Sequence, residues 1–255
     1  MSKALVEIVR DHPGLVIAVS GGVDSMTLAS FAHKLDPDVT VVHAVSPAVQ
    51  PAATARVRRH AEASGWSLSI VGSGEFDDSR YRDNPLERCY FCKTHLYDRI
   101  RQITDRPVAS GANLDDLGEF RPGLRAAAEH TVIHPFVLAG MDKSAVRALA
   151  RELGLTDLAE LPAQPCLASR VQTGISIVPE DLAFIDEAET NLRELCPPTS
   201  DIRCRITRHG VEFEVSADAM ADLDRLSAAA EQVCRRSGRT FAGIGPYRRG
   251  SMFVR

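Results

Sequence analysis

The chain has 255 residues, of which 44% are hydrophobic, and a formal net charge of −4 at neutral pH. This length and composition support a substantial core, whereas the acidic balance excludes a global basic field for holding a nucleic acid. No apolar run approaches the roughly 18 residues of a membrane span, and the N-terminal "MSKALVEIVRDHPG" is too charged for a signal peptide. We therefore expect a cytoplasmic protein with no membrane partner.

Short β-rich runs alternate with amphipathic segments through the first half of the chain. That alternation is typical of βα units around a parallel sheet, so the predicted fold class is α/β. The predicted strands cover residues 14–20, 39–45, 68–73, 107–113 and 131–137, and the predicted helices cover 24–35, 52–65, 92–103, 121–130 and 142–155.

A proline-rich stretch, "LPAQPCLASRVQTG", then interrupts the alternation. We place a domain boundary there, which gives an N-terminal domain over 1–160 and a smaller C-terminal α+β domain over 161–255. The second domain is expected to help form the substrate pocket and the contacts of a homo-oligomer. Its predicted helices cover 179–195 and 221–238 and its predicted strands 201–207 and 211–216, before a last edge segment.

The stretch "SGGVDS", which starts at Ser20, joins the first predicted strand to the first predicted helix. Its backbone N–H groups and the hydroxyls of Ser20 and Ser25 would lie at a helix N-terminus, where the helix dipole favours an anion. Gly21 and Gly22 permit a phosphate to approach the backbone, and Asp24 is placed to hold Mg²⁺. The lysine of a Walker loop is absent. The alternative is a tight turn in which serine and aspartate act only as caps.

This turn resembles the PP-loop of the ATP pyrophosphatase superfamily, which implies that ATP is split into AMP and pyrophosphate to adenylate a substrate. Further segments resemble the LarE family of ATP-dependent sulfur transferases. They are "NPLERCYFCK", "SGANLDDLGEFRPGLRAAAEH", "PAQPCLASR" and the terminal "GPYRRGSM", so the likeness runs over nearly the whole chain.

The resemblance implies an adenine nucleotide alpha hydrolase-like fold for the first domain and a role in nickel-pincer nucleotide biosynthesis. ATP would adenylate a carboxylate of a pyridinium biscarboxylic acid mononucleotide, and sulfur would replace a carboxylate oxygen. The partner is then a small-molecule nucleotide, with no stable nucleic acid. Two alternatives stay open: a tRNA thiolase or amidotransferase-type ligase with the same loop, and a metal-cluster delivery protein that uses nucleotide as a switch.

Cys166 is the candidate sulfur donor. It stands in an irregular segment with Arg170 close by in the sequence, and a nearby guanidinium favours a thiolate. The resemblance implies that this thiolate attacks the acyl-adenylate, and that loss of the Cα proton then breaks the Cβ–S bond and leaves dehydroalanine. The alternative is that Cys166 is a small buried hydrophobic residue in a loop.

Cys89 and Cys92 form a C-x-x-C pair, which suits a redox couple, half of a zinc site or part of an iron–sulfur site. Some members of the resembled family carry three such cysteines, which implies a [4Fe-4S] cluster on Cys89, Cys92 and Cys166. Whether Cys166 is sacrificed or ligates a cluster stays open. The other three cysteines have no such spacing, and we interpret them as structural.

Several charged residues are candidates to support the reaction. Asp116 follows a predicted strand at the edge where ligands bind in open α/β sheets, and is a candidate to hold Mg²⁺ or the ribose. Arg121 is a candidate for a phosphate or the substrate, and Arg170 is a further candidate to bind the substrate. Arg203 and Arg205 are two residues apart on a predicted strand, so they share a face that suits a phosphate or a dicarboxylate. Glu189 matches an acidic position in the family and is a candidate base for the elimination, although a surface helix carries such charges routinely.

The chain departs from the family pattern directly after Arg170. Where family members commonly continue "ASRIPYG", this chain reads "ASRVQTG". We therefore expect the loop beside Cys166 to differ in detail from the family pattern, and with it the substrate that the protein accepts.

Overall fold

The computed structural model describes residues 2–118, 120–197, 199–248 and 250–252. They form two units: residues 1–77 with 89–163 make unit 1, and residues 78–88 with 164–255 make unit 2. The segment 78–88 thus packs with unit 2, although it falls within the expected N-terminal domain. Glu119 and Arg249, which stand in two of the family-like motifs, lie outside the described residues.

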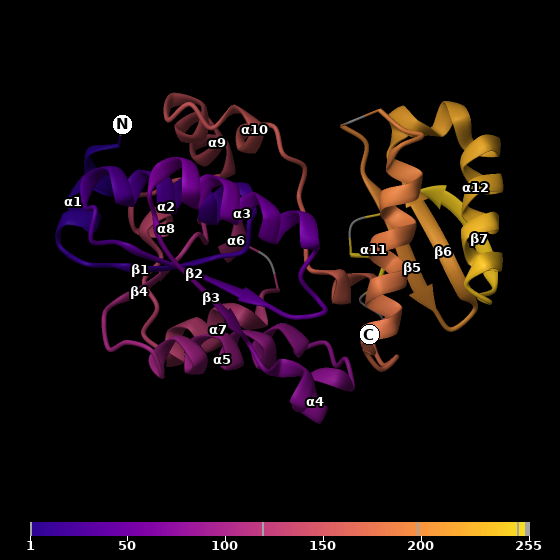
Figure 1. Ribbon diagram of the computed structural model, residues 1–255, viewed down its shortest axis with the longest axis horizontal. Helices are drawn as coiled ribbons and strands as arrows, with labels where there is room; N and C mark the ends of the chain where they lie inside the picture. Colours follow the sequence, from indigo (N-terminus) through magenta and orange to yellow (C-terminus); the bar gives the residue numbers. More distant parts are fainter. Residues whose placement is uncertain (1, 119, 198, 249, 253–255) are drawn as a thin grey trace. The chain divides into compact units, whose positions relative to one another are not determined.

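A four-stranded parallel sheet forms the centre of unit 1 (Figure 1), which confirms the predicted α/β class. Parallel strands need crossover connections, and the predicted helices supply them. The strand order is β3-β2-β1-β4. The strands are β1 (Val16–Val19), β2 (Thr40–Val45), β3 (Ser67–Gly72) and β4 (Val108–Ser110).

Helices cover both faces of this sheet (Figure 1). Ile17 and Val19 of β1 belong to a core with α1, α2, α3, α8, α9 and α10, whereas Val16 and Ala18 belong to a core with α5 and α7. All four residues are apolar because β1 is buried on both faces. The helices are α1 (Lys3–Arg10), α2 (Val23–Leu35), α3 (Pro51–Ser64), α5 (Arg88–Arg101), α6 (Leu114–Leu117), α7 (Pro122–Glu129), α8 (Pro135–Leu138), α9 (Lys143–Glu152) and α10 (Thr156–Ala159), with a 3₁₀ turn η1 (Glu75–Asp77).

The prediction of a strand over 131–137 was wrong for most of its length. Ile133 makes only an isolated bridge to Ala109, and α8 begins at Pro135. Proline lacks the N–H that a strand ladder needs and suits the first turn of a helix, so it ends the extended segment here.

Unit 2 is built on a three-stranded sheet with the order β5-β6-β7. β5 and β6 form an antiparallel hairpin, and α12 is the crossover that makes β7 parallel to β6. Helix α11 packs on β5 and α12 on β7 (Figure 1). The strands are β5 (Ile202–Thr207), β6 (Gly210–Val215) and β7 (Phe241–Pro246), and the helical segments are α4 (Ser79–Arg82), η2 (Leu167–Arg170), α11 (Pro179–Arg193), η3 (Ala217–Asp222) and α12 (Leu223–Arg236).

Asn84 ties the segment 78–88 into unit 2. Its side chain is fully buried, and its Nδ2 lies 2.9 Å from the carbonyls of both Gln172 and Ile175. Its own carbonyl accepts the N–H of Gly174 at 3.0 Å. One asparagine therefore fixes the loop that follows η2.

Within the described part of the chain, every helix is too short or too polar to cross a lipid bilayer.

Gly111, at the end of β4, gives a test of the packing in unit 1. A β-carbon there would lie 2.6 Å from the backbone nitrogen of Ser25 and 2.8 Å from the carbonyl carbon of Asp24. Real β-carbons do not approach so closely, so Gly111→Ala should force β4 away from α2 and lower the free energy of unfolding by about 1–3 kcal/mol. Chemical denaturation measures this.

The matched control is Gly72→Ala at the end of β3, where an added β-carbon meets no atom within 4 Å. If Gly111→Ala were as stable as Gly72→Ala, the close approach of β4 to α2 would be contradicted.

Candidate functional site

The glycine turn lies at the carboxyl edge of the unit 1 sheet, between Val19 of β1 and Val23 of α2. β2 lies on one side of β1 and β4 on the other, so the strand order reverses at β1 although all four strands are parallel. Ligands of open α/β sheets bind at such a point. The predicted strand–turn–helix is therefore present, in the position where it can receive a nucleotide.

Hydrogen bonds within the turn hold its backbone in a tight loop. The N–H of Ser20 donates to Ser25 Oγ at 3.1 Å, and the Ser25 hydroxyl donates to the carbonyl of Gly22 at 3.3 Å. Gly21 has a φ of 83°, in the left-handed region that favours glycine. Gly22 caps α2 without a side-chain hydrogen bond, so the first N–H groups of α2 have no cap side chain and suit an anion.

Asp24 lies beside this loop with a quarter of its side chain exposed. Asn113 Nδ2 donates to its Oδ1 at 3.3 Å, and Lys143 Nζ lies 3.8 Å from its Oδ2. Burial raises the pKa of Asp24 above its usual value; Lys143 opposes that rise and the like charge of Asp116 adds to it. The carboxylates of Asp24 and Asp116 offer hard oxygen ligands, which fit Mg²⁺.

Asn113 and Asp116 form a capping box at the start of α6. The Asn113 side chain accepts the N–H of Asp115 at 3.0 Å, and Asp116 Oδ2 accepts the N–H of Asn113 at 3.1 Å. Arg121 Nη2 lies 2.7 Å from Asp116 Oδ1. The structure thus brings Arg121 to Asp116, at the same edge of the sheet as Asp24.

Three residues that the sequence analysis missed support the loop from β2 and α3. His43 is fully buried; its Nδ1 donates to the carbonyl of Val19 at 2.9 Å, and its Nε2 lies 2.9 Å from Thr54 Oγ1. Burial lowers the pKa of His43, so the ring is neutral. Arg56 Nη1 donates to the carbonyl of Gly21 at 2.8 Å. The one signal in the sequence is a histidine inside the apolar run "VTVVHAV".

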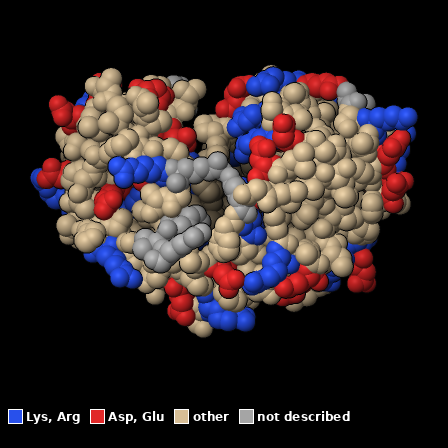
Figure 2. Space-filling model, turned by 180° about the vertical axis from the view of Figure 1, so that it is seen from behind, with Lys and Arg blue, Asp and Glu red and all other residues tan. Residues whose placement is uncertain are grey.

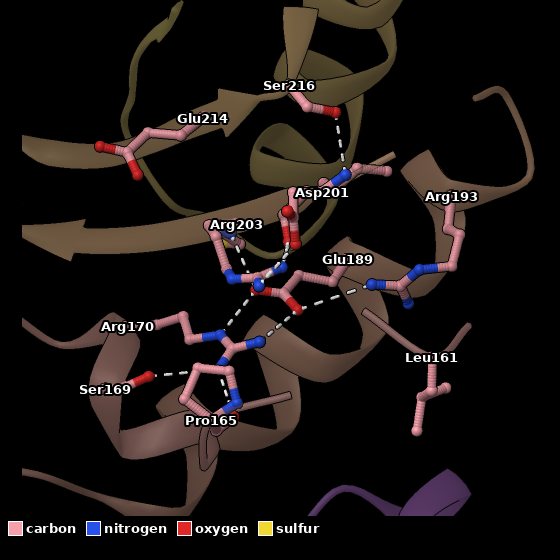
Figure 3. Close-up of polar contacts among 12 residues, drawn as sticks. Leu161, Pro165, Ser169, Arg170, Glu189, Arg193, Asp201, Arg203, Glu214 and Ser216 are labelled. Atoms are coloured by element: carbon pink, nitrogen blue, oxygen red, sulfur yellow. Dashed lines mark hydrogen bonds and ion pairs between the residues drawn. The ribbon is translucent and has the colours of Figure 1, made fainter. Parts of the chain in front are cut away.

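Arg170 and Glu189 form a buried ion pair in unit 2 (Figure 3). Arg170 Nε lies 2.8 Å from Glu189 Oε1 and Nη2 lies 3.0 Å from Oε2, with side chains 1% and 0% exposed. The N–H of Cys204 also donates to Oε1, at 3.1 Å. Burial lowers the pKa of Arg170, but the charge and hydrogen bonds of Glu189 outweigh it, so the pKa is raised. Such a bidentate ion pair fixes the orientation of both side chains.

Cys166 is exposed and stands directly before η2. Arg170 Nη1 donates to the carbonyl of Cys166 and to Ser169 Oγ, each at 3.1 Å. It also donates to the carbonyl of Pro165, as Figure 3 shows. Arg170 thus lies close to Cys166, as expected, but it contacts the backbone carbonyls of Pro165 and Cys166.

Glu189 was predicted as the base of the elimination. Both of its carboxylate oxygens accept from Arg170, and its side chain is fully buried. Because both oxygens are already engaged and the side chain has no exposed surface, this geometry favours a positioning role.

Arg203 and Arg205 share one face of β5, as the spacing predicted, and both are buried. Arg203 Nη2 lies 2.7 Å from Asp201 Oδ1, and Arg205 Nη2 lies 2.6 Å from Glu214 Oε2 on β6. In this structure each guanidinium is thus matched with an acidic partner of the same unit. An anionic ligand would compete with these carboxylates.

Cys89 and Cys92 lie three residues apart in the first turns of α5, so their side chains share one helix face. They belong to unit 1, whereas Cys166 belongs to unit 2. Among the described residues, no group of three His, Cys, Asp or Glu side chains is arranged to hold a metal ion. None of the six cysteines, all of which are among the described residues, forms a disulfide.

No protein-family model matches the chain. Sequence comparisons give three relatives that match it over similar lengths. An uncharacterized protein of Synechocystis sp. is 36% identical over 185 residues, which cover 71% of this chain and 69% of that protein. An uncharacterized protein of Methanocaldococcus jannaschii is 28% identical over 183 residues, covering 70% and 69%.

The third relative carries a functional name. The pyridinium-3,5-bisthiocarboxylic acid mononucleotide synthase of Lactiplantibacillus plantarum is 30% identical over 205 residues, which cover 78% of this chain and 74% of that enzyme. The match confirms the resemblance inferred from the motifs, and the chain belongs to the LarE family of enzymes.

Proposed function

We propose that the chain is an ATP-dependent sulfur transferase that acts on a carboxylate of a pyridinium biscarboxylic acid mononucleotide, in nickel-pincer nucleotide biosynthesis. The name of the L. plantarum relative supports the substrate class. The observation that carries the proposal is the lysine-free phosphate loop at the carboxyl edge of a parallel sheet, with Asp24 beside it.

In this proposal the loop binds the triphosphate of ATP. The N–H groups of Gly21 and Gly22 and the hydroxyls of Ser20 and Ser25 hold the phosphates at the N-terminus of α2. Asp24, with Asp116, would hold a Mg²⁺ ion, which supplies positive charge to the pyrophosphate leaving group. Burial and the like charge of Asp116 raise the pKa of Asp24, although Lys143 opposes this, and the raised pKa supports a cation beside Asp24.

Adenylation makes the carboxylate reactive. A carboxylate oxygen of the substrate attacks the α-phosphorus of ATP, and pyrophosphate leaves. The Cys166 thiolate then attacks the acyl carbon, and AMP leaves with the former carboxylate oxygen. Loss of the Cα proton of Cys166 breaks its Cβ–S bond, so the product keeps the sulfur and the protein keeps dehydroalanine.

Arg170 positions the reacting cysteine in this proposal. Its guanidinium binds the carbonyl of Cys166 and is itself fixed by Glu189, so the cysteine backbone is held while the thiol stays exposed. Arg203 and Arg205 are proposed to bind the anionic groups of the substrate by exchange with their carboxylate partners. Arg121 is proposed for the same role beside the nucleotide.

The alternative sulfur source is a [4Fe-4S] cluster on Cys89, Cys92 and Cys166. Thiolates are the ligands that such clusters use, and two of the three share a face of α5. The sulfur would then come from the cluster, and Cys166 would survive the reaction.

The acidic net charge of −4 favours a small-molecule substrate over tRNA. Figure 2 shows acidic and basic side chains interspersed over the face that it draws, rather than one basic stripe. RNA binding depends on clustered cations, so the tRNA thiolase alternative has less support.

Asp24→Asn tests the nucleotide site. The variant loses a metal-binding carboxylate, so pyrophosphate release should fall on the order of a hundredfold or more. Because folding raises the pKa of Asp24, mainly through burial, its charged form opposes folding above the unfolded-state pKa. Asparagine removes that charge, so the melting temperature at neutral pH should be unchanged or higher.

Asp105→Asn is the matched control, because Asp105 is exposed in the same unit. Pyrophosphate release and thermal unfolding are measured on both variants. Normal release from Asp24→Asn would contradict the loop assignment.

Cys166 is tested by intact mass after a single turnover of protein purified without iron. β-Elimination predicts the loss of about one H₂S from the Cys166 peptide, matched by one thiolated product. Cys166→Ala should form AMP but no thiolated product, whereas Cys196→Ala should behave as the wild type.

The cluster alternative is decided on anaerobically purified protein with iron and sulfide measured. Unchanged mass, thiolated product and bound iron that is lost in Cys89→Ala would together overturn the sacrifice of Cys166 in favour of the cluster.

Glu189→Gln separates a positioning role from a base role. The change leaves the buried Arg170 guanidinium without its full counter-ion, which should lower the free energy of unfolding by about 3–5 kcal/mol. Glu187→Gln, on the exposed face of α11, should have little effect. Chemical denaturation measures both. A Glu189→Gln variant as stable as Glu187→Gln, which accumulates a thioester at Cys166, would instead identify Glu189 as the base.

A further inference from the structure

The first turns of α3 lie directly against the phosphate loop. A β-carbon built on Gly21 would lie 2.8 Å from the carbonyl oxygen of Ala53 and 3.0 Å from its β-carbon. Gly21 also has a φ of 83°. Two separate constraints therefore require glycine at this position, and the close approach to Ala53 shows that the loop packs against α3.

Arg56 reaches this loop from the next turn of α3. Its side chain is 8% exposed, and its Nη1 donates to the carbonyl of Gly21 at 2.8 Å. The neighbouring Arg58 and Arg59 on the same helix are exposed. A guanidinium is costly to bury unless its hydrogen bonds are used, so the contact with Gly21 is a specific feature of Arg56.

This contact sets the orientation of one peptide group. The peptide between Gly21 and Gly22 is trans, as are all described peptide bonds, so its C=O and N–H point in opposite directions. With the carbonyl turned toward Arg56, the N–H of Gly22 points away from α3. Its nitrogen lies 3.4 Å from Ser20 Oγ, a long contact that an anion can replace.

We propose that Arg56 is a positioning residue for the nucleotide: it holds the Gly21–Gly22 peptide so that the N–H of Gly22 faces the bound phosphates. The inference rests on the proposed function, because it assumes that the loop binds ATP. A peptide between two glycines turns easily, and a fixed carbonyl removes that freedom before the ligand arrives.

A second contact from the same region supports this role. Thr54, two residues before Arg56, bonds to His43, and His43 donates to the carbonyl of Val19. The carbonyls of residues 19 and 21 are thus both held, one through a histidine and one directly. The loop is therefore anchored on both sides of Ser20.

The test compares the binding of ATP with that of adenosine, by calorimetric titration in the presence of Mg²⁺. Arg56→Met should weaken ATP binding by about tenfold or more, the loss expected for a charge-assisted hydrogen bond, and leave adenosine binding unchanged. Arg56→Lys keeps the charge and one donor, so it should recover part of the ATP affinity. Arg59→Met, which removes an exposed charge from the same helix, should change neither ligand's affinity.

Unfolding midpoints of all variants are measured in the same buffer. ATP binding by Arg56→Met at wild-type strength, or an equal loss of ATP and adenosine binding, would overturn the role of Arg56. Wild-type protein that binds no ATP would overturn the proposed function, and this inference with it. The two failures are thus distinguished by the wild type alone.

Discussion

Parallel pairing of four strands is the constraint on which the site of unit 1 depends. Because β1, β2 and β4 run in the same direction, their carboxyl ends meet at one edge. Asp24 follows β1, His43 lies on β2 and Asn113 follows β4. Asp24 and Asn113, which are 89 positions apart in the sequence, can therefore form a hydrogen bond. β1, which is buried on both faces, leads directly into the glycine turn.

The two units differ in how far their buried charges are compensated by an opposite charge. In unit 1, Asp24 keeps an unfavourable charge, because Lys143 only partly offsets burial and the neighbouring Asp116. In unit 2, Arg170 and Glu189 are matched with each other through two short contacts. A bound cation would offset the unfavourable charge of Asp24. The Arg170–Glu189 pair needs no further partner, because each charge is matched by the other. Under the proposed function, unit 1 would receive the nucleotide and its metal ion, while the ion pair of unit 2 would hold the loop that carries Cys166.

The sequence predicted most elements of both sheets because their signals are local. Hydrophobic runs, glycine stops and the Ser20–Ser25 turn all act within a few residues. The features that the sequence did not predict depend on contacts between distant residues or on a single proline. Pro135 turned an apparent strand into α8, and the roles of His43 and Arg56 depend on loop carbonyls far away in the sequence. The ion pair of Glu189 was equally invisible, because its partner lies 19 residues earlier on a different element.

The path of the chain through residues 78–88 has a consequence for how the protein folds. Asn84 bonds to carbonyls that come 87 to 91 residues later in the chain. During synthesis this segment leaves the ribosome long before its partners exist, and the rest of unit 1 is made in between. Unit 2 can therefore complete its fold only late in synthesis, when residues 171–175 can bind the segment 78–88, which was made soon after β3. A fragment that starts at the proline-rich boundary lacks that piece, and with it the residue that fixes the loop after η2.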